Sequence, residues 1–161
     1  IAWIEPEKYP VVPLLESCFD LITSGTHDIV LPTRKSLESY PMYQELSELR
    51  ANRELGFITG RPELDFYFGL RVFNKKGAKL FLSYDGEGGD TWHIFFIPVL
   101  RAIANGSHLV GQTLVNYVHP AEQTAAEVGD AKMDRKRDHQ REVLVSAMRE
   151  EAERLGYTGL N

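Results

Sequence analysis

Residues 64–97, LDFYFGLRVFNKKGAKLFLSYDGEGGDTWHIFFI, carry the strongest secondary-structure pattern in the chain. They contain three runs in which apolar residues recur at every second position, and the polar segments 74–77 and 85–90 separate these runs. A period of two is typical of a β-strand with one covered face, and Gly-rich polar segments between such runs favour hairpin turns. The stretch therefore predicts an antiparallel meander of three strands.

The N-terminal part predicts two helices and one strand. Apolar residues at helical spacing over positions 14–22 indicate a buried helix that places Cys18 in the core. The apolar run 28–31 ends at Pro32, which indicates a strand at or near a sheet edge, because proline donates no ladder hydrogen bond. An amphipathic helix is expected over residues 41–56, ended by Gly56. Its apolar stripe, expected to face the core, consists of Met42, Leu46 and Leu49.

The C-terminal part predicts a short helix over residues 98–105, a fourth meander strand over 108–118, and a long helix that begins at an Asp130 cap and ends near Leu155. Residues 132–142 are almost entirely charged or polar, so they are expected to project into solvent or to contact a partner. The whole pattern predicts a single α+β domain over residues 1–161, with an antiparallel sheet of four to five strands, helices packed on one face, and a long C-terminal helix.

Composition narrows the class of protein. The 161 residues are 43% hydrophobic and 25% charged, which is typical of a globular protein rather than a disordered or fibrous one. A net charge of −5 argues against a nucleic-acid-binding role, and no apolar run reaches the length of a membrane helix. Cys18 is the single cysteine and residues 1–4 show no secretory signal, so we expect a bacterial, cytoplasmic protein.

The acidic loop 85–90 is the segment with the most potential chemistry. Its carboxylates stand on a Gly-rich backbone, and oxygen ligands of this kind suit a divalent metal ion. One hypothesis is therefore a metal-dependent hydrolase or phosphodiesterase with a divalent cofactor. The ligands or base would be Asp85, Glu87, Asp90 and His93. The simpler interpretation is a soluble hairpin tip, because turns favour Gly and Asp in any case.

Other catalytic motifs are missing from the sequence. No two histidines have the i,i+4 spacing of a zinc helix, and the Gly-rich loop is not followed by the Lys-Ser/Thr pair of a phosphate-binding loop. The apolar surroundings of Cys18 favour a core residue over a thiol nucleophile. The sequence thus leaves the question of an enzyme open.

The hypothesis we favour from the sequence is a non-catalytic protein that needs no cofactor and binds another protein or a second copy of itself as a homodimer. The interleaved Asp134 and Asp138 would repel a phosphate backbone, so nucleic acid is not the expected partner. Aromatic residues on an open sheet face, together with the charged helix, would form the contact. The predicted partner-binding residues are Tyr67, Arg71, Phe73, Phe81, Arg135, Arg137 and Arg141.

A third hypothesis is a pocket for a small ligand between the sheet and the helices. Tyr67, Trp92 and His93 would line it, because all three are expected on or beside the predicted meander. An aromatic pocket of this kind would need a cavity that only the folded chain can reveal.

Overall fold

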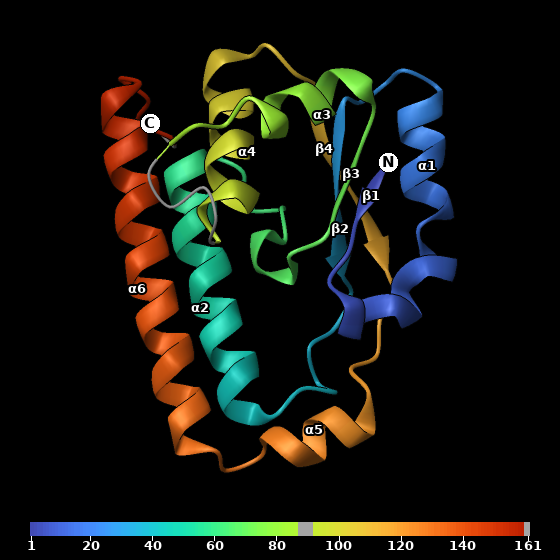
Figure 1. Ribbon diagram of the computed structural model, residues 1–161, viewed down its shortest axis with the longest axis vertical. Helices are drawn as coiled ribbons and strands as arrows, with labels where there is room; N and C mark the ends of the chain where they lie inside the picture. Colours follow the sequence, from blue (N-terminus) through green and yellow to red (C-terminus); the bar gives the residue numbers. More distant parts are fainter. Residues whose placement is uncertain (87–91, 160–161) are drawn as a thin grey trace.

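The computed structural model describes residues 1–86 and 92–159, and it has an α+β architecture around a mixed four-stranded sheet (Figure 1). The strands are β1 (Ala2–Trp3), β2 (Ile29–Arg34), β3 (Arg71–Phe73) and β4 (Val110–Val115). Their order is β1-β3-β2-β4, with β3 antiparallel to β1 and β2, and β4 parallel to β2. The α+β class is confirmed, but the prediction of a purely antiparallel sheet is wrong.

The helices cover both faces of the sheet. They are the 3₁₀ helices η1 (Pro6–Leu14) and η2 (Phe66–Phe68) and the α-helices α1 (Glu16–Thr23), α2 (Met42–Thr59), α3 (Lys75–Leu82), α4 (His93–Asn105), α5 (Ala121–Glu127) and α6 (Ala131–Arg154). Figure 1 shows α1 on one side of the sheet and α4, α2 and α6 on the other. The predicted long C-terminal helix is confirmed as α6, whereas the prediction of helices on a single face is wrong.

Strand β2 lies inside the sheet rather than at its edge. Ile29 and Leu31 belong to the core beneath α2, α4 and α6, while Val30 belongs to the core beneath η1 and α1. Burial on both faces explains why this run is continuously apolar. Pro32 lies past Val30, the last residue that pairs with β3, so its missing N–H removes no bond to that strand.

Residues 64–97 do not form the predicted meander. The first run contains η2 and only three strand residues, and the second and third runs are the helices α3 and α4. Asn74, expected in a turn, caps α3 by accepting hydrogen bonds of 2.9 Å from the backbone N–H groups of Lys76 and Gly77. Helix α4 continues through Pro98, and its residues Phe96, Ile97, Val99 and Leu100 are all buried. Because consecutive positions are buried, the sequence has no alternation of apolar and polar residues with the period of a helix.

Helix α2 has the opposite orientation to the one predicted. The expected core residues Met42, Leu46 and Leu49 are 75%, 60% and 49% exposed. The face that turns inward instead carries Gln44, Ser47, Glu48, Ala51 and Leu55. The helix also continues past Gly56 and ends at Gly60, whose φ of +65° is the left-handed conformation typical of a helix end. In the first half of α2, polar side chains therefore face the interior of the molecule and an apolar stripe faces solvent, while the second half buries apolar residues such as Leu55.

Helix α6 begins where the sequence predicts, because Asp130 accepts hydrogen bonds from the N–H groups of Lys132 and Met133 at 2.9 and 3.1 Å. It packs lengthwise along α2 (Figure 1). The expectation that residues 132–142 only project outward is wrong, since Arg141 is buried and the Tyr43 hydroxyl of α2 donates a hydrogen bond to Asp138.

Candidate functional site

A cavity of about 250 Å³ lies at the carboxyl ends of the parallel strands β2 and β4. Tyr40, in the connection after β2, lines it together with Tyr117 and His119, which follow β4. Neighbouring parallel strands bring the residues that follow them to the same edge of a sheet, and ligands of α/β proteins commonly bind there. Helices α2, α4, α5 and α6, with η1 and η2, complete the wall.

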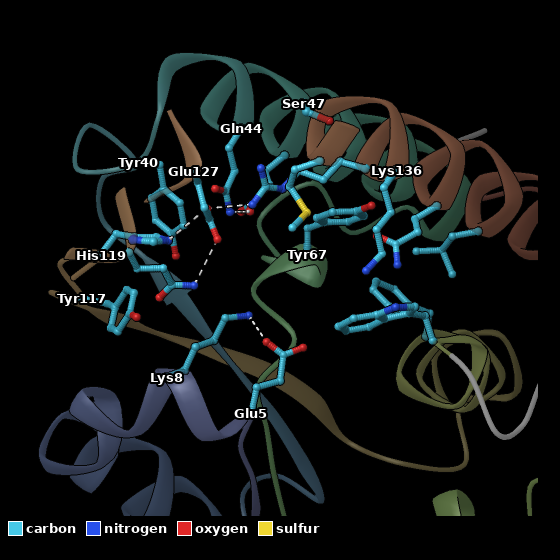
Figure 2. A pocket seen from close by; sticks show the side chains of 18 residues that line it. Glu5, Lys8, Tyr40, Gln44, Ser47, Tyr67, Tyr117, His119, Glu127 and Lys136 are labelled. Carbon is cyan, nitrogen blue, oxygen red and sulfur yellow. Dashed lines mark hydrogen bonds and ion pairs between the residues drawn. The ribbon is translucent and has the colours of Figure 1, made fainter. Parts of the chain in front are cut away.

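The labelled side chains define two ends of this cavity. Figure 2 shows Tyr40, His119 and Glu127 gathered at one end, which we call the inner end, and Lys136 of α6 at the other. Gln44 projects from α2, and Lys8 and Glu5 lie across the cavity from it (Figure 2). The groups that meet here are separated by more than a hundred residues in the chain.

A buried ion cluster of Arg34, Asp65 and Glu48 supports the cavity. The guanidinium of Arg34, the last residue of β2, donates two hydrogen bonds to Asp65, at 2.7 and 2.9 Å, and one to Glu48 of α2, at 2.5 Å. The backbone N–H of Arg34 donates a further bond of 3.3 Å to Asp65. Burial raises the pKa of Asp65, but the guanidinium of Arg34 outweighs it, so the net pKa lies below its ordinary value. The guanidinium of Arg34 thus serves two carboxylates, and the buried Arg71 also interacts electrostatically with Asp65.

Gln44 extends this network into the cavity. Its Nε2 donates a hydrogen bond of 2.8 Å to Glu48 Oε1, and its Oε1 has no hydrogen-bond partner although the side chain is buried. The reverse orientation of the amide would direct the carbonyl oxygen at the carboxylate, so we assign the orientation with Nε2 toward Glu48. The cavity therefore contains an unused acceptor from α2.

Unpartnered polar atoms concentrate at this cavity. Among the described residues, seven buried side-chain polar atoms lack a hydrogen-bond partner, and five of them belong to residues that line the cavity. An unpartnered buried polar group costs about 1–3 kcal/mol, so such groups are rare without a reason. The Arg34 guanidinium lies 5.1 Å from the centre of the Tyr40 ring, and the Tyr40 hydroxyl has no hydrogen-bond partner. The five atoms are Glu5 Oε1, Tyr40 OH, Gln44 Oε1, Ser47 Oγ and Arg137 Nη1.

His119 provides a further acceptor. Thr124 donates its hydroxyl proton to Ser39 O at 3.0 Å, so His119 Nδ1, 3.3 Å from that hydroxyl and from Pro120 O, is assigned the ring proton. Burial lowers the pKa of His119, which favours the neutral ring. Its Nε2, which lies 3.9 Å from Glu127 Oε2, then carries a lone pair.

The remaining walls are aromatic, and one cation is unpaired. Tyr67, Trp92 and Phe96 line the cavity, and Trp92 is 42% exposed, which places it at the mouth. Burial raises the pKa of Tyr67 to about 12, so its hydroxyl is neutral. Lys136 has no ion pair or hydrogen bond within the described part of the chain, and its side chain is exposed. The site combines apolar walls with a few polar groups.

The predicted partner-binding residues lie in different parts of the structure and do not form one surface. Arg71, Phe73, Phe81 and Arg141 are only 0%, 5%, 2% and 6% exposed, so the expected exposed aromatic patch does not form. Arg71 donates hydrogen bonds to the carbonyl oxygens of residues 66, 70 and 95 instead. Tyr67 and Arg137 line the cavity, and Arg135 is exposed on α6. A partner role for these seven residues stays a prediction.

The predicted metal loop is only partly placed. Asp85 is exposed and His93 is the first residue of α4, whereas Glu87 and Asp90 lie outside the described residues. Within residues 1–86 and 92–159, no group of three or more His, Cys, Asp or Glu side chains is arranged to hold a metal ion. The metal-dependent hydrolase stays an untested alternative.

The cavity includes two of the three residues of the third hypothesis, Tyr67 and Trp92, but His93 does not line it. Sequence reasoning missed the remaining polar lining. Polar and aromatic residues follow directly after the apolar runs that form β2 and β4. This position would have indicated the site if the two runs had been recognised as neighbouring parallel strands. The main residues missed were Glu5, Lys8, Tyr40, Gln44, Ser47, Tyr117, His119, Glu127 and Lys136.

Comparisons of the chain with protein-family models, curated proteins and solved structures found no match. No helix within the described residues is both long enough and apolar enough to span a bilayer. Functional inference for this chain therefore depends on the geometry of the cavity.

Proposed function

We propose that this protein binds a small organic molecule in the cavity at the carboxyl ends of β2 and β4. The observation that carries this proposal is the convergence of unpartnered buried polar atoms on one aromatic-lined cavity. Ligand sites typically combine apolar walls with a few well-placed polar groups, and a ligand supplies the missing hydrogen bonds. The volume of about 250 Å³ is below the range for drug-sized ligands, so the ligand is a small one.

Burial and support of the polar groups also favour binding. Gln44 and Ser47 are each 8% exposed, and both lie on α2, which the Arg34–Glu48 ion pair ties to the end of β2. Rigid support of this kind keeps a site ready for its ligand and reduces the entropy lost on binding. Ordered water alone would satisfy the same atoms, and binding experiments separate the two cases.

The test is a thermal-shift screen of small polar aromatic compounds, followed by titration calorimetry. A ligand that binds only the folded state raises the Tm, and the rise increases with the logarithm of its concentration relative to its Kd. We expect stabilisation of the wild-type protein and of Ser146→Leu, an exposed helical control, but not of Ser47→Leu, which fills the cavity. Circular dichroism shows whether Ser47→Leu is folded. Gln44→Leu is the second cavity variant and replaces Ser47→Leu if that variant is not folded. A blank screen, or equal responses of folded cavity variants and control, would reject the proposal.

A second proposal is that the protein associates with a second copy of itself through α2. Helix α2 presents Met42, Leu46 and Leu49 to solvent on one face, with Tyr43 beside them, and exposed apolar stripes of this kind mark interaction surfaces. Light scattering after gel filtration tests the homodimer directly. We expect a dimer mass for the wild-type protein and a monomer mass for Leu46→Lys. A monomer in both cases would remove self-association through this stripe.

A further inference from the structure

We propose that the cavity ligand is a hydroxylated aromatic acid, with its hydroxyl at the inner end beside Gln44 and His119 and its acidic group beside Lys136. This inference rests on the small-molecule-binding proposal and adds the chemical class of the ligand. It follows from the unequal distribution of donors, acceptors and charge between the two ends of the cavity.

The inner end requires a group that donates and accepts hydrogen bonds. Gln44 Oε1 and His119 Nε2 are acceptors without a proton donor, while Arg137 Nη1 is a donor without an acceptor. A hydroxyl group donates one hydrogen bond and accepts others, so it can serve both kinds of partner at once. The hydroxyl proton pairs with one of the two acceptors while the hydroxyl oxygen accepts from Arg137 Nη1, whereas an ether or a methyl group at this place would leave both acceptors without a donor.

An acidic group is disfavoured at the inner end. Glu48 belongs to the ion cluster in which Arg34 faces two carboxylates, and Glu127 lies nearby beside His119. A ligand carboxylate would therefore lie close to the carboxylates of Glu48 and Glu127, whose arginine partners are already engaged in ion pairs. Like charges at close range in a protein interior repel strongly.

Lys136 is the place for the acid. Among the cations that line the cavity, Lys8 pairs with Glu5 and Arg137 pairs with Glu127 at 2.7 Å, whereas Lys136 is unpaired among the described residues. Figure 2 shows Lys136 at the end of the cavity away from His119. An anion there gains a charge partner without competing with an existing ion pair.

The aromatic walls of the cavity suit a flat ring. Tyr67 and Phe96 line it with ring centroids 6.1 Å apart, and Trp92 lines it at the mouth. Aromatic side chains favour stacked or edge-to-face contacts with a ligand ring, which add to the burial of apolar area. The small volume of the cavity limits the ligand to a single ring or a fused pair with short substituents.

Three probes separate the contributions. The probes are 4-hydroxyphenylacetate, 4-hydroxyphenylacetamide and phenylacetate, which differ in the charge or in the hydroxyl alone, and the measurement is calorimetric titration of the full chain. For the wild-type protein we expect the hydroxy acid to bind about fivefold more tightly than its amide, as one partly exposed ion pair provides. We expect it to bind about tenfold more tightly than phenylacetate, because loss of the hydroxyl leaves buried groups unpaired.

Two variants assign these effects to residues. Lys136→Gln should abolish the preference for the acid over the amide while the affinity for the amide stays unchanged. Lys132→Gln, an exposed lysine one turn earlier on α6 that does not line the cavity, should retain the preference. Gln44→Leu should reduce the preference for the hydroxylated probe without changing the preference for acid over amide.

The outcomes distinguish the two proposals. Equal binding of acid and amide, equal effects of Lys136→Gln and Lys132→Gln, or no binding of any probe at millimolar concentration would overturn the ligand class. The proposal of small-molecule binding in the cavity would still hold after each of these results if another compound from the thermal-shift screen raises the Tm of the wild-type protein but not that of Ser47→Leu. It falls when that screen is blank, or when folded cavity variants and the control respond equally.

Discussion

The Gln44 amide donates a hydrogen bond of 2.8 Å to Glu48, one turn further along α2, and its carbonyl oxygen stays buried without a partner in a residue that lines the cavity. Glu48 is in turn held by Arg34 at the end of β2. A residue of the cavity wall is thus connected to the end of the central strand β2 through the side chains of Glu48 and Arg34. This connection makes the stability of the fold and the geometry of the site depend on the same charged residues.

Removal of the Arg34 charge should strongly destabilise the protein. In Arg34→Met, Asp65 and Glu48 stay buried without their cation, so we expect a loss of about 3–5 kcal/mol in the free energy of unfolding. Arg50→Met is the control, because Arg50 makes an exposed ion pair with Glu54 and should lose less than about 1 kcal/mol. Urea unfolding followed by circular dichroism measures both. Similar losses for the two variants would contradict the importance of the buried cluster.

The stability should depend on pH through Asp28. Burial opposes its ionisation, but hydrogen bonds from Lys76, Asn74 and the Leu109 N–H outweigh this effect and lower the pKa from 3.8 to about 2. Because the folded pKa is the lower one, the carboxylate stabilises the fold above pH 4 and loses this effect as the pH falls toward 2. The contribution amounts to about 2 kcal/mol.

Asp28→Asn tests this contribution by urea unfolding at pH 7 and at pH 3. We expect the variant to be less stable than the wild-type protein at pH 7 and the difference to shrink at pH 3. Asp20→Asn, on the exposed side of α1, is the matched control and should differ little at either pH. A difference that grows as the pH falls would show that the sign is wrong.

Paired substitutions on α2 test the orientation of this helix. Leu46→Ala should change the free energy of unfolding by no more than about 0.5 kcal/mol, because the side chain is 60% exposed. Leu55→Ala should cost about 2–5 kcal/mol, because Leu55 is fully buried and leaves a cavity. Thermal and urea unfolding of both variants give the comparison. The reverse order of costs would mean that α2 turns its apolar stripe inward.

Gly77→Ala should be unfavourable although alanine normally stabilises a helix. A Cβ at this position of α3 would lie 2.6 Å from the Asp28 carbonyl oxygen, so the helix must shift away from β2. We expect a loss of about 1–3 kcal/mol, in place of the usual gain of about 0.5–1 kcal/mol. Lys79→Ala, exposed on the same helix, serves as the control and should be nearly neutral. A raised Tm for Gly77→Ala would refute the close packing.

Several features were predictable because neighbouring residues determine them. Asp130 caps α6 through its own side chain, and the apolar residues around Cys18 identify the helix α1 and the core position of Cys18. The expectation that this helix is largely buried is wrong, because Cys18 is its one buried residue and Phe19 is exposed. The β2 strand was also visible as a short apolar run. The errors arose where tertiary contacts changed the pattern. Residues 93–100 of α4 are apolar on nearly every side because other elements surround the helix, so no period distinguishes it from a strand.

The amino-acid sequence by itself determined the α+β class, the long capped C-terminal helix and the approximate positions of β2 and α1, because caps and short apolar runs act over neighbouring residues. The tertiary structure alone decided that β4 lies parallel to β2, that α2 turns its polar face inward, and that groups from Glu5 to Arg137 meet in one cavity. The physical reason is that strand pairing and helix orientation depend on the total burial of distant segments against one another, which no local pattern records.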